Sequence, residues 1–191
     1  MRNLMDHNNQ VVSFDDEKLI LVDNEDNIIG YKTKEECHRG NGILHRAFSI
    51  FIFNDRNQLL IQKRSDSKQL WPLYWSNSCC SHPRKGEKVE EAAYRRLKEE
   101  LGIESQLKIL FKFQYSVPYK NVGSEREMCS VLIGKSNSHI SPNKNEIDEW
   151  KYTDIEKLEE NMSINPDKYT PWFKLEWERI KKDHWQEIEN L

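Results

Sequence analysis

Glycine, proline and long apolar runs are all scarce in this sequence of 191 residues. It contains 7 Gly and 6 Pro, and no apolar run approaches the length of about 18 residues that predicts a membrane span. These shortages exclude collagen-like, low-complexity and membrane-spanning proteins. The chain is long enough for one domain with a substantial core. We therefore predict a single domain over residues 15–191, after a frayed N-terminal segment of residues 1–14.

The sequence also lacks an excess of charge of either sign. It has 29 Lys and Arg against 32 Asp and Glu, a net charge of -3. No overall field attracts nucleic acid or an anionic membrane, and we expect neither as a partner. The first residues carry no basic start followed by an apolar core, so no targeting peptide is evident. We expect a cytoplasmic protein, and the sequence leaves a monomer or a dimer open.

Cysteine is too sparse to form a disulfide framework. The four cysteines are Cys37, Cys79, Cys80 and Cys129, and no two have the CxxC spacing of a ligand pair. We expect free thiols. Cys79 and Cys80 point to opposite faces of an extended segment, so at most one of them serves a given cavity. A strained disulfide between these two under oxidation is a further hypothesis.

The pattern of apolar residues predicts strands on both sides of one central helix. Alternation and short apolar runs indicate strands over residues 18–22, 28–32, 45–53, 59–63, 107–115, 128–133 and 150–153. A capping box of Thr33 and Glu36 predicts a short helix through His38. An apolar face followed by Gly102 predicts the central helix over residues 89–101. Residues 65–84 show no period and are expected to form a long ordered loop.

Helical patterns dominate the C-terminal part of the chain. A short helix is expected from Asp154, and a long C-terminal helix after the Thr170-Pro171 start. The apolar stripe of that long helix consists of Phe173, Trp177, Ile180, His184 and Ile188. The fold class is therefore α/β (α+β), a mixed β-sheet sandwiched between helices, with an N-terminal hairpin and helix as an extension.

Two charged side chains lie on the wrong face of the central helix. At about 100° per residue, Arg96 and Glu100 fall within the apolar arc of Val89, Ala93 and Leu97. Burying an unpaired charge is costly. Arg96 and Glu100 therefore either pair with each other across one helical turn, as on many ordinary helices, or face a polar cavity that holds an ion or a ligand.

A second group of chemically active side chains lies outside this helix. It comprises His38, His45, His82, Glu125 and Glu127. On a strand, the two carboxylates point to the same face about 7 Å apart. Three imidazoles and two carboxylates suit a divalent metal, with water or substrate completing the shell. Each residue taken singly is more often structural or a surface residue, so the sequence alone leaves their convergence open.

The central helix and the segment before it resemble the Nudix box, G-x5-E-x7-REUxEExGU, where U is aliphatic. Glu87, Arg95, Glu99, Glu100 and Gly102 match the pattern. Two positions depart from it, because Ser81 replaces the first glycine and Arg96 replaces an acidic residue that holds catalytic magnesium in Nudix hydrolases. The resemblance implies a Nudix-like fold and argues against hydrolysis.

A wider resemblance, over roughly Lys18 to Trp177, is to the type I isopentenyl-diphosphate isomerases, Nudix-fold enzymes of isoprenoid synthesis. The blocks that carry it are, in order, His38 with His45-Arg-Ala-Phe-Ser49, Lys63-Arg-Ser65 through Lys68 with Trp71-Pro72 and Trp75, Asn77-Ser-Cys-Cys-Ser-His-Pro83, Arg95 to Gly102, Tyr115, Glu125-Arg-Glu127 and Thr170-Pro-Trp172. Their agreement in order and spacing is highly specific. It implies isomerisation of isopentenyl diphosphate to dimethylallyl diphosphate by proton transfer through a carbocation-like intermediate.

This resemblance also implies roles for individual residues. One divalent metal, manganese, zinc or magnesium, would be held by His38, His45, His82, Glu125 and Glu127. Cys80 and Glu127 would be the acid/base pair, with Tyr115 bonded to Glu127 and Trp172 facing the carbocation. Lys34, Arg64, Lys68 and Arg96 would bind the diphosphate, and Glu100 would help to hold a magnesium ion that arrives with it. Arginine suits this role because its planar fork donates paired hydrogen bonds to phosphate oxygens.

Two other functions remain open. A Nudix hydrolase of a nucleoside or isoprenoid diphosphate is supported by the helix alone and disfavoured by Arg96. A catalytically silent Nudix-fold module, for example one that binds RNA, is disfavoured by the net charge of -3 and the lack of a basic, aromatic stripe. Residue 96 separates the isomerase from the hydrolase, and Cys80 with Glu127 separates it from the binding module.

Overall fold

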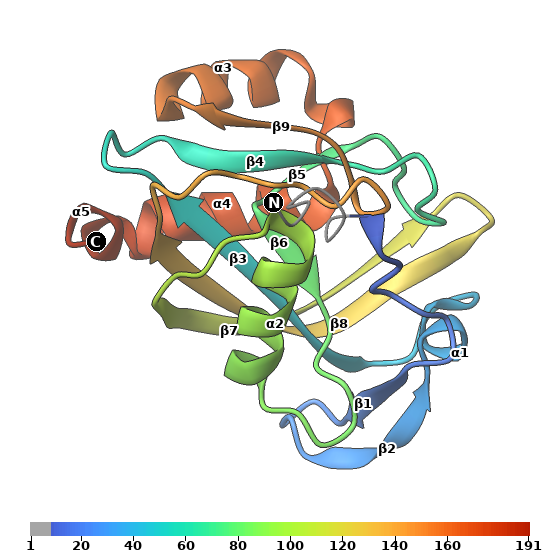
Figure 1. The fold of residues 1–191 in the computed structure, drawn as a ribbon. Coiled ribbons are helices and arrows are strands. Elements are labelled where there is room, and N and C mark those ends of the chain that lie inside the picture. Colours follow the sequence, from blue (N-terminus) through green and yellow to red (C-terminus); the bar gives the residue numbers. More distant parts are fainter. Residues whose placement is uncertain (1–8) are drawn as a thin grey trace, which may run out of the picture.

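Residues 9–191, the part of the chain that the computed structural model describes, form groups of consecutive strands separated by helices, with the last helices at the C-terminal end (Figure 1). The strands are β1 (Lys18–Val22), β2 (Ile28–Thr33), β3 (His45–Phe53), β4 (Leu59–Arg64), β5 (Trp75–Ser76), β6 (Cys79–Ser81), β7 (Leu107–Tyr119), β8 (Gly123–Lys135) and β9 (Ile147–Thr153). The helices are α1 (Lys34–His38), α2 (Val89–Leu101), α3 (Ile155–Ile164), the 3-10 turn η2 (Pro166–Lys168), α4 (Pro171–Asp183) and α5 (Trp185–Glu189). This order confirms the expected mixed-sheet α/β class.

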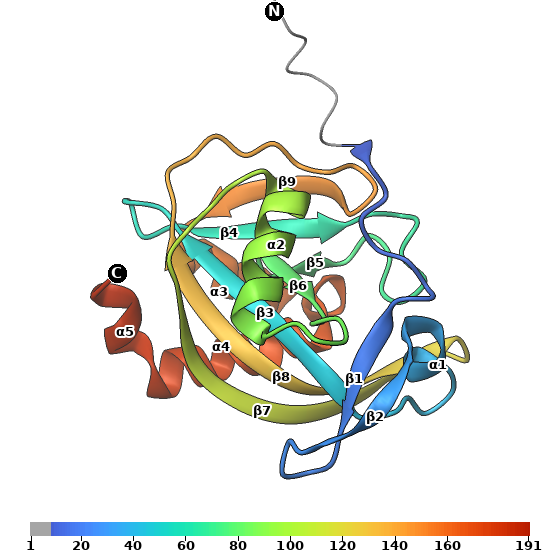
Figure 2. The same ribbon diagram turned by 60° about the horizontal axis from the view of Figure 1, so that its bottom comes forward.

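β3 is the centre of one mixed sheet. It runs parallel to β8, from the His45–Glu127 pair to the Phe53–Lys135 pair, and antiparallel to β6 and β1. β8 continues antiparallel into β7, and β1 into β2. At its C-terminal end β3 pairs with β4 at a single position, Phe53 with Leu59. β4 pairs in turn with β5 and β9. β3 and β4 therefore diverge from their hairpin, and the short strands β5 and β6 lie between them (Figure 2).

Helices cover both faces of this sheet (Figure 2). Phe48 and Ile50 of β3 pack against the apolar side of α2, which includes Leu97. Phe51, which alternates with them, packs on the other face against α4, where its ring stacks on Trp177 at 6.3 Å. A strand covered on both faces is apolar almost throughout, as β3 is. Within residues 9–191, no helix has both the length and the apolar character needed to cross a bilayer.

Local signals place the helix ends where the sequence predicts them. The capping box at the start of α1 is complete, because Thr33 Oγ1 accepts from Glu36 N and the Glu36 carboxylate accepts from Thr33 N. α2 ends at Gly102, whose φ of 71° is the left-handed conformation that glycine adopts most easily. Pro171 begins α4. These caps fix the ends of the three helices that carry residues of the cavity described below.

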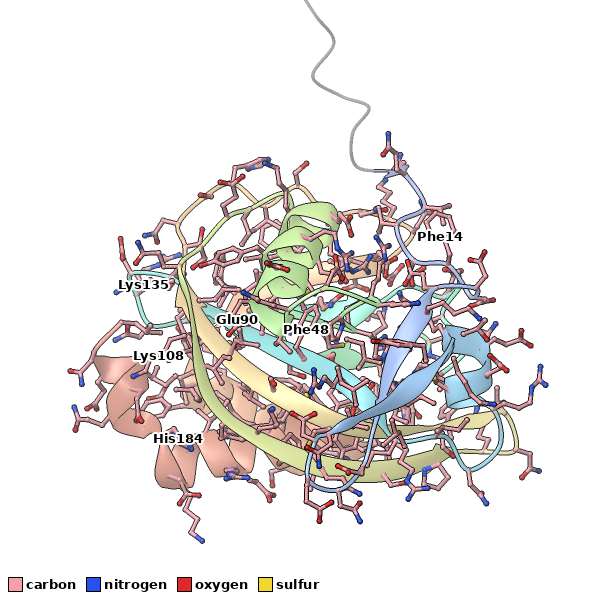
Figure 3. The ribbon with its side chains drawn as sticks, turned by 90° about the horizontal axis from the view of Figure 1, so that it is seen from below. Phe14, Phe48, Glu90, Lys108, Lys135 and His184 are labelled. Carbon is pink, nitrogen blue, oxygen red and sulfur yellow. The ribbon has the colours of Figure 1, made fainter. Side chains whose placement is uncertain are left out.

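Two expected elements differ from the structure. Residues 65–84 are not one continuous loop, since β5 and β6 lie within them, and strands of two or three residues are too short to show a period. The long C-terminal helix ends at Asp183, and a second helix, α5, carries Ile188. His184 leaves the helical conformation (φ -135°, ψ 15°) and stacks on Phe111 at 5.0 Å. His184 therefore lies at the bend between α4 and α5 (Figure 3).

The N-terminal segment expected to fray, residues 1–14, lies partly outside the described residues. In the part that is described, the carbonyls of Asn9 and Gln10 accept hydrogen bonds from the side chains of Asn145 and Asn143, each at 2.8 Å. Arg96 donates to the carbonyl of Val12 at 2.8 Å. Residues 9–14 therefore lie along the edge of the molecule formed by the end of α2 and the loop before β9.

Candidate active site and metal centre

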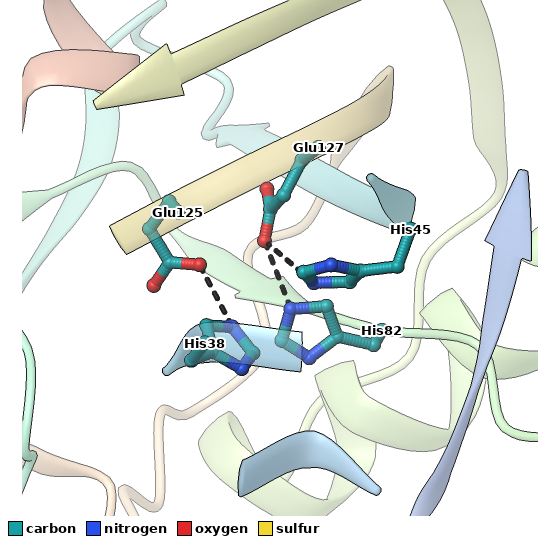
Figure 4. Close-up of side chains that lie close together, drawn as sticks. All are labelled: His38, His45, His82, Glu125 and Glu127. Carbon is teal, nitrogen blue, oxygen red and sulfur yellow. Dashed lines mark hydrogen bonds and ion pairs between the residues drawn. The ribbon is translucent and has the colours of Figure 1, made fainter. Parts of the chain in front are cut away.

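Five candidate metal ligands converge at one end of the sheet (Figure 4). His38 ends α1, His45 begins β3, His82 follows β6, and Glu125 and Glu127 project from β8. One donor atom of each lies within 4.8 Å of the others. The parallel register explains part of this convergence, because it pairs His45 directly with Glu127. We call these five residues the metal cluster.

Backbone carbonyls orient two of the imidazole rings. His38 Nδ1 lies 2.7 Å from the Lys34 carbonyl oxygen, and His45 Nδ1 lies 2.7 Å from that of Ile43. A carbonyl only accepts, so each Nδ1 carries a proton and each Nε2 is the nitrogen that faces the cluster. His45 Nε2 is buried without a hydrogen-bond partner among the described residues, and Glu127 Oε1 is 3.7 Å away. A buried nitrogen left in this way is costly unless a ligand uses its lone pair.

Burial controls the protonation of the metal cluster. It lowers the pKa of His45 to about 3 and the pKa of His82 well below its usual range, and the neighbouring rings add to both effects. Burial and the charge of Glu125 raise the pKa of Glu127 well above its usual value. Burial also opposes ionisation of Glu125, but His38, 2.8 Å away, holds its pKa at about 2. The cluster therefore offers two neutral imidazoles, those of His45 and His82, and one carboxylate, that of Glu125, which stays ionised beside His38.

This donor set fits a divalent metal ion. Neutral imidazole nitrogens and carboxylate oxygens are the forms in which these side chains ligate metals. A cation among them would give His45 Nε2 the partner that it lacks. It would also remove the repulsion between Glu125 and Glu127 that raises the pKa of Glu127. The residues present are thus those of a metal site, as the sequence predicts.

A cavity of about 400 Å³ opens beside the metal cluster. Its walls include all four expected catalytic residues, Cys80, Tyr115, Glu127 and Trp172, and all four expected diphosphate ligands, Lys34, Arg64, Lys68 and Arg96. The volume lies within the range of small-molecule sites. Residues on α1, β4, β6, β7, β8, α2 and α4, and in the N-terminal segment, meet here.

Cys80 and Glu127 share this cavity although β3 separates their strands. Cys80 pairs with Ser49 and Glu127 with His45, so both side chains rise from the same face of the sheet. Burial raises the pKa of the Cys80 thiol to about 12, against the effect of Arg64, whose Nη1 lies 3.8 Å from Sγ. Cys79 packs instead into the core under α2. The extended strand points the two sulfur atoms away from each other, which disfavours a disulfide between them.

Tyr115 and Trp172 line the cavity next to Glu127. Tyr115 Oη donates a hydrogen bond of 2.6 Å to Glu127 Oε2. The Trp172 ring lies 6.4 Å from the Tyr115 ring and nearly parallel to it, at 29°. Arg64 Cζ lies 5.2 Å from the centroid of the Trp172 ring. A cation already lies over this aromatic face, which is the property that the stabilisation of a developing positive charge requires.

Lys34, Lys68 and Arg96 meet two buried carboxylates in what we call the cation cluster. Arg96 Nε and Nη2 donate to Glu100 Oε1 at 3.0 and 2.6 Å, and Nη2 lies 3.2 Å from Glu146 Oε2. Lys68 Nζ also bonds to Glu146. Both explanations of the misplaced helix charges therefore hold, because Arg96 pairs with Glu100 and also lines the cavity. Glu100 itself is not among the described residues that line it.

The sequence analysis missed two buried carboxylates. Glu146 lies in a polar loop without periodicity, so no sequence signal indicated it. Glu176 lies within the apolar stripe of α4 and is fully buried, with Cys129 Sγ donating to it at 3.5 Å. Burial raises the pKa of Glu176 to about 8. The reasoning that selected Arg96, a charge within an apolar helical face, applies equally to Glu176 and would have found it.

Comparisons with known proteins identify the family to which this chain is related. The NUDIX domain profile matches residues 43–173. Isopentenyl-diphosphate Delta-isomerase 1 of Photorhabdus laumondii is 42% identical over 174 residues, 90% of this chain and 99% of that protein. Isopentenyl-diphosphate delta-isomerase of Schizosaccharomyces pombe is 35% identical, over 97% of this chain and 90% of that protein.

Solved structures share the fold. DR0079 from Deinococcus radiodurans superposes with a TM-score of 0.64 at 25% identity, covering 78% of this chain and 90% of its own. The MutT protein from Methanosarcina mazei superposes with a TM-score of 0.61 at 17% identity, covering 73% of this chain and 94% of its own, a likeness of fold alone. The domain match, the sequence identities over nearly the full length of the relatives and the shared fold agree. The chain belongs to the type I isopentenyl-diphosphate isomerase family of the Nudix superfamily.

Proposed function

We infer that this chain isomerises isopentenyl diphosphate to dimethylallyl diphosphate, with residues 15–191 as one catalytic domain. The observation that carries the residue assignments is that Cys80 and Glu127 line one cavity together with the cation cluster. The presence of Arg96, where a Nudix hydrolase has a metal-binding carboxylate, argues against hydrolysis of the same diphosphate. The substrate is a small molecule, and the cytoplasm is the compartment that we assign, in keeping with four free cysteines.

The reaction moves a double bond by one position. One proton adds to the terminal alkene carbon, C4, which leaves positive charge on C3, and one proton leaves C2, so the number of protons on the substrate is unchanged. We assign proton donation to Glu127 with its hydrogen-bonded Tyr115. Cys80 accepts the proton from C2 as its thiolate, a form that burial disfavours and that the Arg64 guanidinium, 3.8 Å from Sγ, favours. Each positioned acid or base contributes about 10²- to 10⁴-fold to the rate.

The remaining cavity residues hold the substrate and protect the cation. Trp172 faces the charge that develops on C3, an interaction of about 2 kcal/mol in a dry site. Lys34, Arg64, Lys68 and Arg96 bind the diphosphate oxygens. Val11 and Ser13 of the N-terminal segment line the cavity and restrict the access of water, which would otherwise trap the cation as an alcohol.

Two ions complete the proposal. A divalent ion, manganese, zinc or magnesium, bound in the metal cluster would withdraw electron density from Glu127 and so would strengthen the acid side of the site. His38, His45, His82, Glu125 and Glu127 would hold it. Glu100, behind Arg96, would help to hold the magnesium ion that accompanies the diphosphate.

Incubation with isopentenyl diphosphate and magnesium in D₂O tests this proposal. The expected result is dimethylallyl diphosphate that carries deuterium, with no release of free phosphate. Cys80→Ala and Glu127→Gln are each expected to abolish deuterium incorporation, while Cys37→Ala, which removes a thiol outside the cavity, retains it. Phosphate release without isomerised product would instead identify a hydrolase. Full activity in Cys80→Ala would remove Cys80 from the mechanism.

A further inference from the structure

One buried carboxylate of the cavity belongs neither to the metal cluster nor to the expected ligands. Glu146 lies directly before β9, with its side chain 3% exposed. Its backbone N–H donates to the Asn143 carbonyl and its carbonyl accepts from Ser65 N, both at 2.9 Å. These bonds fix the main chain of Glu146 beside the loop that carries Lys68. The carboxylate is therefore held in the cavity wall.

Glu146 is the counter-charge of the cation cluster. Its Oε2 bonds to Lys68 Nζ and lies 3.2 Å from Arg96 Nη2. Burial opposes its ionisation, but Lys68 and Arg96, with a smaller effect from Lys34, hold the pKa of this carboxyl at about 2. Glu146 is thus an anion throughout the neutral range. It occupies donors that we have assigned to the substrate diphosphate.

An entering diphosphate must share these donors with Glu146 or displace it from them. The fixed backbone keeps the carboxylate close to the phosphate oxygens in either case. Like charges placed side by side in a buried site repel each other and weaken binding. A diphosphate that carries Mg²⁺ brings two positive charges with it and avoids most of this repulsion. A diphosphate without the metal does not.

We propose that Glu146 is a specificity-determining residue, which makes binding in this cavity depend on Mg²⁺ by repelling the metal-free diphosphate. It does so by presenting a fixed negative charge between Lys68 and Arg96, where only a ligand that brings its own cation is accommodated. The inference rests on the proposed function, because it takes Lys68 and Arg96 as the diphosphate ligands.

Calorimetric titration with inorganic diphosphate tests the proposal without relying on activity. The protein is used with its metal cluster loaded and free ions removed, and the dissociation constant is measured with and without added Mg²⁺. The wild-type protein is expected to bind more weakly without Mg²⁺. The quantity compared is the dissociation constant without Mg²⁺ divided by the constant with Mg²⁺. In Glu146→Gln this ratio is expected to fall about tenfold, because the metal-free affinity rises when the repulsion is removed. Glu149→Gln, which removes a carboxylate 58% exposed beside Lys63, leaves the ratio unchanged.

The outcomes separate this inference from the proposed function. An unchanged ratio in Glu146→Gln, or an equal loss of affinity with and without Mg²⁺, overturns the role of Glu146. Undiminished diphosphate affinity in Lys68→Gln overturns the assignment of the site instead. If Glu146→Gln loses its circular-dichroism signal, the charge-balanced variant Glu146→Gln/Lys68→Gln is compared with Lys68→Gln. The same fall in the ratio is expected there, and its absence again rejects the inference.

Discussion

The metal cluster and the cation cluster adjoin one cavity, yet they treat buried charge in opposite ways. In the metal cluster, two carboxyl groups and three imidazole rings face one another, and His45 Nε2 has no hydrogen-bond partner among the described residues. In the cation cluster, Glu100 and Glu146 already neutralise Arg96 and Lys68. The metal cluster needs a bound ion as the partner of its buried donor atoms. In the cation cluster the charges are already paired, so a ligand that enters must replace existing partners.

This difference teaches how the two sites respond to their ligands. A set of donors without a counter-charge gains stability when an ion binds, because burial otherwise penalises it. A set already paired gains less from a new contact, since each new hydrogen bond replaces an old one. We therefore expect metal binding to stabilise the fold more than diphosphate binding does at the same ligand concentration.

The largest expected effect is the removal of the metal. A chelator, or His45→Asn, is expected to abolish isomerisation and to lower the melting temperature of the loaded protein. A ligand present at 100 times its dissociation constant stabilises the folded state by about 2.7 kcal/mol. Differential scanning calorimetry with and without added metal measures this shift. His139→Asn, an exposed histidine outside the cluster, is the control, and a metal-dependent shift that persisted in His45→Asn would break the comparison.

The next effect is on diphosphate binding. Lys68→Gln is expected to raise KM for isopentenyl diphosphate by roughly 10- to 100-fold, since hydrogen bonds to charged groups are worth about 1.5–3 kcal/mol. The metal content of the protein, measured by atomic absorption, is expected to stay the same. Lys63→Gln, which removes an ion pair with Glu149 at 2.7 Å outside the cavity, should leave KM unaltered. A loss of metal in Lys68→Gln would show that the two clusters are not independent.

A smaller effect is expected from Trp172, whose ring lines the cavity. Trp172→Phe keeps an aromatic face with a weaker attraction for cations, so kcat is expected to fall about tenfold with KM little changed. Trp172→Leu removes the face and is expected to lower kcat further. Steady-state kinetics on both variants, with Trp150→Phe as an exposed control, measures the difference. Equal kcat values in the Phe and Leu variants would contradict a role for the aromatic face.

The last effect concerns stability rather than activity and lies at Glu176, a buried carboxyl group matched by neither metal nor cation. Its pKa is raised to about 8 by burial, so the folded state keeps it protonated at a pH where the unfolded chain ionises. Stability is therefore lost as the pH rises from the unfolded pKa of about 4.3 towards 8, by at most roughly 1.4 kcal/mol per pH unit. Urea unfolding at several pH values should show a flatter profile for Glu176→Gln. An identical slope in wild type and variant would mean that Glu176 is ionised in the fold.

Much of the fold was predictable because its signals are local. The Thr33–Glu36 capping box, Gly102 after an apolar helical face, and the apolar run of β3 each depend on a few neighbouring residues. The two short strands within residues 65–84 were not predictable, because β5 and β6 are held by pairing with β4 and β3 and have no residue pattern of their own. His184 was assigned to a continuous helix because its contact with Phe111 joins distant parts of the chain.

The sequence by itself determined the residue types of the site and, through the order and spacing of its motifs, the family. Only the tertiary structure decided that three rings and two carboxylates meet within 4.8 Å, that Cys80 and Glu127 share a cavity across β3, and that Glu146 neutralises Lys68 and Arg96. The physical reason is that side-chain chemistry is a property of single residues, whereas charge compensation in a buried site depends on distances between residues far apart in the chain.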